Sequence, residues 1–177
     1  MKNNYLQDMF SLEGKVALVT GGGRGIGQVI CRELARCGAD IAIFSRSGAG
    51  ETVKLIESEG GKALIIADAT DESSVRKGME KIMEVYGRLD IVVNNAGVCY
   101  HKDAFEATVE EWRECLDINL TGEYIVCRDA ARVMIENNFK GSMVNIASMS
   151  GHIVNVPQCQ AAYNASKAGV IHMTKSL

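Results

Sequence analysis

Tyr163 and Lys167 lie four residues apart near the end of the 177-residue sequence. If this stretch is helical, both side chains project from the same face, about one turn apart. A free phenol has a pKa of about 10 and is a poor base near neutral pH, but a neighbouring ammonium favours the phenolate. The pair is therefore a candidate general acid and base. Many helices carry this spacing by chance, so the interpretation depends on the rest of the sequence.

The composition describes a compact, mildly acidic chain. Its hydrophobic fraction is 47% and its formal net charge is -3. The sequence has no basic excess suited to nucleic acid, and no apolar run reaches the roughly 20 residues of a bilayer-spanning helix. The amino terminus is polar and lacks a signal-peptide core. We therefore expect a cytoplasmic protein that binds neither nucleic acid nor membrane.

The cysteines and histidines predict no metal site. The six cysteines include no C-x-x-C pair, and their neighbours are mostly apolar. Free thiols in a reducing compartment are therefore expected. The three histidines show no metal-ligand spacing with these cysteines.

Short apolar runs alternate with helix-length amphipathic segments along the whole chain. The expected strands are 15–20, 41–44, 63–67, 91–93 and 142–146, and the expected helices are 26–37, 52–59, 73–86 and 109–137, with a break near Asn119, and a last helix from Tyr163. This alternation predicts a doubly wound parallel sheet covered on both faces. No linker interrupts it, so 1–177 is expected to be a single domain. Because the last helix shows no stop signal and such sheets usually have more strands, we expect the C-terminal strands and a substrate lid to be missing.

The first strand runs directly into a glycine-rich segment that opens a helix. Its sequence is Thr20-Gly21-Gly22-Gly23-Arg24-Gly25-Ile26-Gly27. Glycines permit a tight turn and close approach of a ligand, and the helix N-terminus offers free N–H groups to a pyrophosphate. The segment predicts a dinucleotide site; a plain glycine-rich turn is the alternative.

The end of the second strand indicates which dinucleotide is bound. Enzymes that select NAD commonly place an acidic residue here to bind the ribose 2′-hydroxyl. This chain has Ser45 and Arg46 instead. Arg46 and Arg24 can pair with a 2′-phosphate, which favours NADP over NAD. If both arginines are only solvated surface residues, NAD remains open.

Taken together, these motifs resemble the short-chain dehydrogenase/reductase family over essentially the whole chain. The matching elements, in the family's order, are Thr20-Gly21-x-x-x-Gly25-x-Gly27, Asp68, Asn94-Asn95-Ala96-Gly97, Asn119, Ser148 and Tyr163-x-x-x-Lys167. The resemblance implies a Rossmann-type fold that binds NAD(P). The implied cofactor-binding residues are Thr20, Gly21, Gly23, Arg24, Gly25, Ile26, Gly27, Ser45, Arg46, Asp68, Ala69, Asn94, Ala96, Gly97, Tyr163 and Lys167.

The resemblance also implies catalytic roles for Asn119, Ser148, Tyr163 and Lys167. The reaction would be reversible hydride transfer between nicotinamide and a carbonyl/alcohol pair, with Tyr163 donating the proton. Lys167 would hold the nicotinamide ribose, and Ser148 would stabilise the substrate oxygen. Asn119 would organise a water in a proton relay. Ser150 is a second candidate for the serine, because both serines lie near the expected distance from the tyrosine.

The segment between serine and tyrosine would line the substrate pocket. The implied substrate-binding residues are Ser148, Ser150, His152, Gln158 and Tyr163. This region resembles the polyol dehydrogenase and ketose reductase branch, which interconverts ketoses and polyols; a polar surface loop is the alternative.

Two other function classes remain open from the sequence. One is a 3-oxoacyl or steroid-type ketone reductase with the same catalytic residues. The other is a cofactor-binding regulator or an inactive oligomer partner. The resemblance implies a homodimer or homotetramer built on the helices that contain Asn119 and Tyr163.

Overall fold

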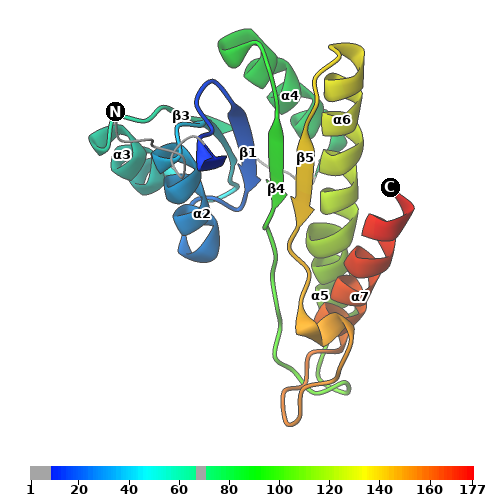
Figure 1. Ribbon diagram of the computed structural model, residues 1–177. Helices are drawn as coiled ribbons and strands as arrows, with labels where there is room; N and C mark the ends of the chain where they lie inside the picture. Colours follow the sequence, from blue (N-terminus) through cyan, green and yellow to red (C-terminus); the bar gives the residue numbers. More distant parts are fainter. Residues whose placement is uncertain (1–8, 67–70) are drawn as a thin grey trace.

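The structure, a computed structural model, describes residues 9–66 and 71–177. Two predicted cofactor residues, Asp68 and Ala69, lie outside the described residues. Five parallel strands form one sheet in the order β3-β2-β1-β4-β5. They are β1 (Val16–Thr20), β2 (Asp40–Phe44), β3 (Ala63–Ile66), β4 (Ile91–Asn94) and β5 (Ser142–Asn145). The predicted parallel, doubly wound architecture is confirmed (Figure 1).

The helices follow the predicted ranges closely. They are α2 (Gly25–Arg36), α3 (Gly50–Ser58), α4 (Glu72–Tyr86), α5 (Val109–Leu116), α6 (Gly122–Glu136) and α7 (Ala161–Ser176), with a π turn η1 (Asp117–Thr121) and a 3-10 turn η2 (Met149–Gly151). The break expected near Asn119 is this π turn, which separates α5 from α6. No helix in the described part of the chain has the length and apolar character required to cross a bilayer.

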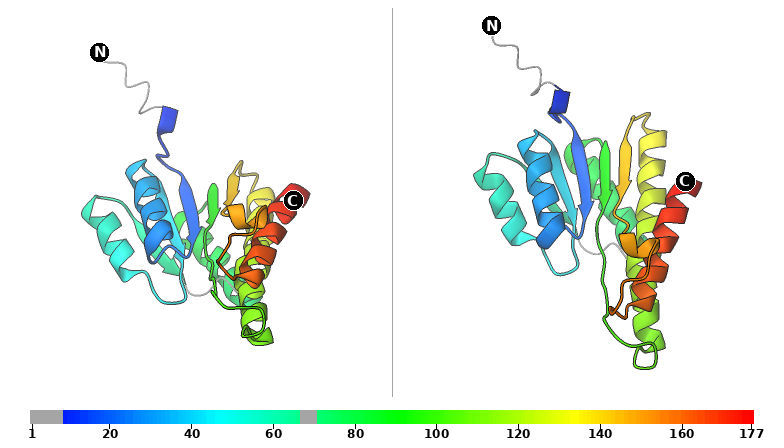
Figure 2. Two further views of the ribbon diagram at one scale, coloured as in Figure 1. Left: turned by 90° about the horizontal axis from the view of Figure 1, so that it is seen from below. Right: turned by 60° about the horizontal axis from the view of Figure 1, so that its bottom comes forward.

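Strand β1 shows why the sheet is covered on both faces. Val16 and Leu18 point into a core shared with α4 and α6, whereas Ala17 and Val19 point into a core shared with α2 and α3. Alternate residues of a strand face opposite sides, so an uninterrupted apolar run needs two covering layers. Figure 2 shows α2 and α3 on one side of the sheet and the α6–α7 pair on the other.

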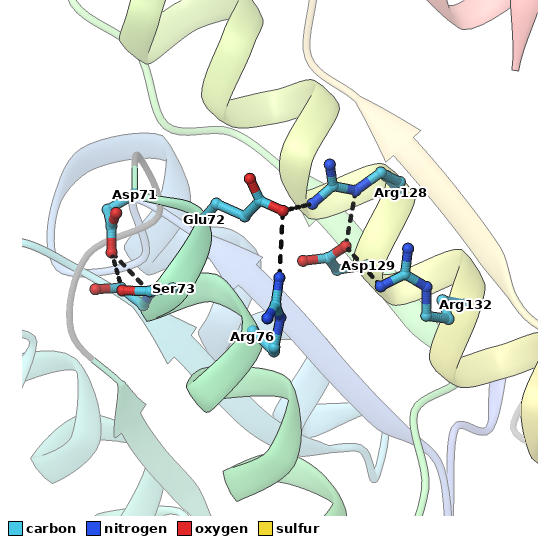
Figure 3. Close-up of polar contacts among 8 residues, drawn as sticks. Asp71, Glu72, Ser73, Arg76, Arg128, Asp129 and Arg132 are labelled. Atoms are coloured by element: carbon cyan, nitrogen blue, oxygen red, sulfur yellow. Dashed lines mark hydrogen bonds and ion pairs between the residues drawn. The ribbon is translucent and has the colours of Figure 1, made fainter.

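An ion-pair network joins α4 to α6, two helices that cover the same face of the sheet (Figure 3). Glu72, in the first turn of α4, accepts hydrogen bonds from Arg128 at 2.8 Å and from Arg76 at 3.3 Å. Arg128 also donates to the buried Asp129 at 2.8 Å, and Arg132 lies 3.8 Å from the same carboxylate. Most of these side chains are partly exposed, so the network contributes little to the stability of the fold.

Candidate active site

A cleft opens at the carboxyl ends of β1, β2 and β4. It lies between β1 and β4, because the chain adds β2 and β3 on one side of β1 and then β4 and β5 on the other side. Its volume is about 440 Å³. The lining residues are Gly21, Gly23, Arg24, Gly25, Ile26, Gly27, Phe44, Ser45, Arg46, Ser47, Asn95, Ala96, Gly97, Val98 and Ile118. Ligands of open α/β sheets bind at this kind of switch point. Most of the predicted cofactor residues therefore share one cleft.

The glycine-rich loop forms the floor of this cleft. Gly21 has a φ of +68°, and a side chain there would place Cβ 2.9 Å from Cα of Ala96. At Gly27 a Cβ would lie 2.3 Å from the carbonyl oxygen of Gly21, so the loop closes onto α2 only with glycine at this position. Helix α2 starts at the loop with no side-chain cap and no acidic residue in its first turn. Its free N–H groups suit an anion such as a pyrophosphate.

Thr20 supports the wall of the cleft that Asn95 and Ala96 form. Its hydroxyl oxygen accepts hydrogen bonds from the N–H groups of Asn95 and Ala96, both at 3.0 Å. The side-chain amide of Asn95 donates to the carbonyl oxygen of Thr20 at 3.1 Å. Thr20 is buried and does not line the cleft, whereas Asn95 does. Thr20 thus shapes the wall, and Asn95 is a lining residue that the sequence prediction left out.

The end of β2 carries the residues predicted to recognise a 2′-phosphate. Ser45 donates a hydrogen bond to the carbonyl oxygen of Gly48 at 2.7 Å, which fixes the turn after the strand. Arg46 is exposed, and its guanidinium lies 4.0 Å from the carboxylate of Glu114 on α5. Among the described residues that line the cleft, Arg24 and Arg46 are charged and none is acidic.

Asn94 lies behind the cleft rather than on it. Its amide donates to Sγ of Cys127 at 3.1 Å and to Oδ1 of Asn145 at 3.0 Å, which ties β4 to α6 and β5. Asn94 therefore holds the end of β4 in place and does not line the cleft, whereas Ala96 and Gly97 do line it.

The π turn places Asn119 in the interior, with no exposed surface. Its Oδ1 accepts from the N–H of Val98 at 2.8 Å, and its Nδ2 donates to the carbonyl oxygen of Val98 at 2.9 Å and to Oγ of Ser166 at 3.0 Å. The side chain thereby joins the cleft wall to α7. π turns of this kind are frequent at functional sites.

Helix α7 confirms the helical spacing of Tyr163 and Lys167. Tyr163 is half-buried, and its carbonyl oxygen accepts from the hydroxyl of Ser166 at 2.8 Å. Lys167 is 3% exposed and donates to the carbonyl oxygen of Ile146 at 2.5 Å. Burial lowers the pKa of Lys167, and the negative charge of Glu123 acts in the opposite direction. A buried ammonium thus lies one turn from the phenol.

The two candidate serines have different surroundings. Ser148 is partly exposed and caps η2, where its hydroxyl oxygen accepts from the N–H of Ser150 at 3.1 Å. Ser150 is buried, and its hydroxyl oxygen accepts from the amides of Asn155 and Gln160, both at 3.0 Å. Because η2 packs against α7, both serines lie beside the helix that carries the Tyr–Lys pair. Of the two serines, Ser148 is the more exposed.

The polar side chains of the loop after η2 differ in burial. His152 and Gln158 are exposed. Gln160 is buried: its amide donates to Oδ1 of Asn164 at 3.0 Å, and its carbonyl lies 3.6 Å from Sγ of Cys99. Gln160 therefore holds the loop against α7.

Comparison with known proteins identifies the family. A family model described as short chain dehydrogenase matches residues 15–177. The chain belongs to this family.

Individual relatives agree with this assignment. A sorbose reductase of Candida albicans is 40% identical over 176 residues, which cover 96% of this chain and 62% of the reductase. An NADP-dependent mannitol dehydrogenase of Alternaria alternata is 40% identical over 179 residues, or 97% of this chain and 67% of that protein. The crystal structure of a short-chain type dehydrogenase/reductase from Mycobacterium marinum has a TM-score of 0.92 at 37% identity and covers 96% of this chain. This chain covers 70% of that structure, so it spans about two thirds of its relatives' lengths.

In this short-chain dehydrogenase the predicted catalytic residues come from three separate parts of the chain. Asn119 lies in the π turn, Ser148 at the cap of η2, and Tyr163 and Lys167 on α7. Hydrogen bonds connect Asn119 through Ser166 to the backbone of Tyr163. The arrangement offers a phenol for proton transfer, a hydroxyl for a polarised oxygen and a buried cation.

Proposed function

We propose that this protein is an NADP-preferring oxidoreductase that transfers a hydride between nicotinamide and a ketone or secondary alcohol, specifically a ketose/polyol pair. The observation that carries the proposal is the buried Lys167 one helical turn from the half-buried Tyr163. Positions four residues apart on a helix share one face, so a phenol that can exchange a proton and a buried cation project from the same side of α7.

When bound in the cleft, the nicotinamide would supply or accept the hydride. In the reductive direction, Tyr163 donates its phenolic proton to the substrate oxygen. The Ser148 hydroxyl donates a hydrogen bond to the same oxygen and stabilises the charge that develops there. Lys167, one helical turn from Tyr163, would hold the ribose hydroxyls of the bound cofactor and supply a positive charge on that side of the helix. The Asn119 side chain is occupied by Val98 and Ser166, so it fixes the geometry of the site.

The preference for NADP rests on charge. Arg24 and Arg46 lie at the edge of the cleft that would receive the adenosine ribose, and a 2′-phosphate can accept hydrogen bonds from both. The matched mannitol dehydrogenase is described as NADP-dependent, in agreement with this choice.

The substrate class rests on two observations. The loop after η2 presents the polar side chains of His152 and Gln158 at its surface. Two matched relatives are described as a sorbose reductase and a mannitol dehydrogenase. A substrate with several hydroxyl groups fits such a loop better than an acyl chain does.

The test is a substrate panel run on the full-length protein with NADPH and NADH. Ketoses, their polyols, an acyl thioester and a steroid ketone would be compared by kcat/KM. We expect turnover of ketoses and polyols with a higher kcat/KM for the NADP pair. Turnover confined to the thioester or the steroid would reject the substrate class, and tight cofactor binding without any turnover would indicate the regulatory alternative. Light scattering on the same sample tests the proposed homodimer or homotetramer, which a monomeric mass would contradict.

A further inference from the structure

Glu123, at the start of α6, is a buried carboxyl that the mechanism above does not use. It is 4% exposed, and within the described residues neither carboxyl oxygen has a hydrogen-bond partner. Burial of a polar group without a partner is unfavourable, and nearly all buried polar groups in folded proteins have one, whether it is protein or water. The surroundings of Glu123 should therefore contain a donor for it.

A small cavity lies against this carboxyl, between the end of β4 and α6. Its volume is about 10 Å³. The residues that line it include Thr20, Asn94, Ala96, Ile118, Glu123 and Val126. A space of about this size holds one water. Ala96 and Ile118 also line the cofactor cleft, so the cavity lies directly behind one wall of that cleft.

Asn94 supplies a second buried acceptor, because its Oδ1 has no partner in the part of the chain that the structure describes. Neighbouring hydrogen bonds fix which end of this amide is the oxygen. The Thr174 hydroxyl donates to the carbonyl oxygen of Val170 at 2.7 Å and therefore accepts from Nδ2 of Asn145 at 2.9 Å. Oδ1 of Asn145 then accepts from Nδ2 of Asn94 at 3.0 Å. A reversed Asn94 amide would bring two acceptors together, so its unpartnered end is the oxygen.

Thr20 supplies a donor. Its hydroxyl oxygen accepts from the N–H groups of Asn95 and Ala96, both at 3.0 Å. These two bonds occupy both lone pairs of the oxygen, so its O–H proton is available for a third bond. The side chains around the cavity thus offer one donor, on Thr20, and two kinds of acceptor, on Glu123 and Asn94. A water that accepts once and donates twice complements this set, and buried waters typically make about three hydrogen bonds.

Other small ligands fit these groups less well. Ca²⁺ and Mg²⁺ take about six to eight oxygen ligands, whereas the lining side chains with unused lone pairs are those of Glu123 and Asn94. An ammonium ion can only donate, so it would leave the Thr20 proton without an acceptor. The donor and acceptor balance therefore favours a neutral water.

We propose that Thr20, Asn94 and Glu123 form a buried water site, and that the bound water joins α6 to the ends of β1 and β4 behind the cofactor cleft. The water accepts from the Thr20 hydroxyl and donates to Oδ1 of Asn94 and to a carboxyl oxygen of Glu123. Because the same hydroxyl holds the N–H groups of Asn95 and Ala96, the water supports the wall of the cleft that these two residues form.

The water can be detected by NMR in the full-length protein. Val126 lines the cavity and is 0% exposed, so a nuclear Overhauser effect between its methyl protons and water requires a water held in the interior. Val75, an equally buried valine on α4 that does not line the cavity, is the control. We expect a cross-peak with water at Val126 and none at Val75. The absence of the Val126 cross-peak would overturn the proposal.

Two substitutions distinguish a bound water from the exchanging proton of the Thr20 hydroxyl, which gives a cross-peak at the same frequency. Glu123→Gln keeps an acceptor oxygen and should keep the cross-peak. Glu123→Leu has a similar size without an acceptor and should lose it, and an undiminished cross-peak in this variant would contradict the water site. If Glu123→Leu does not fold, a crystal structure of the wild type at atomic resolution decides. A water about 2.5–3.0 Å from the three side chains supports the site, and a direct contact between Glu123 and Asn94 rules it out.

The support of the cleft wall is measured by the Kd for NADPH. Glu123→Leu should raise this Kd by about two- to tenfold, which corresponds to the net contribution of one hydrogen bond, and Glu123→Gln should stay within about twofold of the wild type. Glu136→Leu, at the exposed far end of α6, controls for the loss of a carboxyl. An unchanged Kd in Glu123→Leu would reject the link to the cleft. None of these measurements needs turnover, so they are independent of the proposed substrate.

Discussion

The Asn119 side chain holds the backbone of Val98 from both directions. It accepts the N–H of Val98 at 2.8 Å and donates to its carbonyl oxygen at 2.9 Å. Val98 lines the cofactor cleft, whereas Asn119 is fully buried in the π turn between α5 and α6. One amide thus couples an irregular helical turn to the wall of the cleft.

Replacement of Asn119 by alanine should therefore affect both stability and binding. The change removes the partner of the partly buried N–H of Val98 and leaves its carbonyl oxygen only the weak thiol donor of Cys115, so we expect a loss of about 2–4 kcal/mol in the free energy of unfolding. NADPH should bind several-fold more weakly because the wall is no longer fixed. Urea unfolding and a fluorescence titration measure the two effects. Asn137→Ala, which removes an exposed hydrogen bond to Val133, should cost about 0.5 kcal/mol or less, and equal losses in the two variants would argue against this role.

Tyr163→Phe tests the proton donor with a minimal change of shape. Removal of the phenolic oxygen should reduce kcat by about 10²–10⁴-fold, which is the usual contribution of general acid catalysis. The Kd for NADPH should change little, because the ring and the helix remain. Tyr124→Phe serves as the matched control, since Tyr124 lies exposed on α6. If Tyr163→Phe retains wild-type kcat, the phenol is not the proton donor.

Alanine substitutions of Ser148 and Ser150 should have different effects on kcat and on stability. Ser148→Ala should lower kcat by about 10²–10³-fold through loss of a donor to the substrate oxygen, with about 1 kcal/mol or less lost in stability. Ser150→Ala removes the acceptor of the Asn155 amide and one of the two acceptors of the Gln160 amide, so it should cost about 1–3 kcal/mol in stability and reduce kcat much less. Steady-state kinetics and thermal unfolding distinguish them. The reverse pattern would make Ser150 the substrate-binding serine.

The sequence predicted the strands, the helices and the break at Asn119 because these follow from hydrophobic periodicity. It also predicted the glycine loop, since only glycine allows the approach of Gly21 to Ala96. It did not predict which polar residues turn inward. Glu123 follows a glycine in a helical segment and shows no local sign of burial, which arises from packing against distant strands. The inward orientation of Gln160 is likewise decided by its contact with Ser150.

Arg46→Asp tests the cofactor preference. The variant loses a charge-assisted hydrogen bond to a 2′-phosphate, worth about 1.5–3 kcal/mol, and gains a carboxylate suited to the 2′-hydroxyl of NAD. We expect the ratio of NAD to NADP affinity to rise at least tenfold, measured by fluorescence titration with both reduced cofactors. Glu114→Gln removes the carboxylate 4.0 Å from Arg46 and should leave NADP binding equal or tighter. Arg113→Asp, an exposed change on α5 outside the cleft, controls for net charge; a similar shift in that variant would refute a local role for Arg46.

Glu123 should make the protein less stable as pH rises through neutrality. Its pKa of about 7 in the fold exceeds the value of about 4.3 for an unfolded glutamate. Between these values the native state binds more protons than the unfolded state, so stability falls with increasing pH and the full cost is reached above pH 7. Glu123→Gln removes this cost and should raise the free energy of unfolding at pH 8 by up to about 4 kcal/mol, with little effect at pH 4. Urea unfolding of both proteins across this range measures the difference. An equal effect at both pH values would show that the fold does not raise the pKa of Glu123, whereas a gain confined to high pH would show that the buried carboxyl lowers the stability of the native protein.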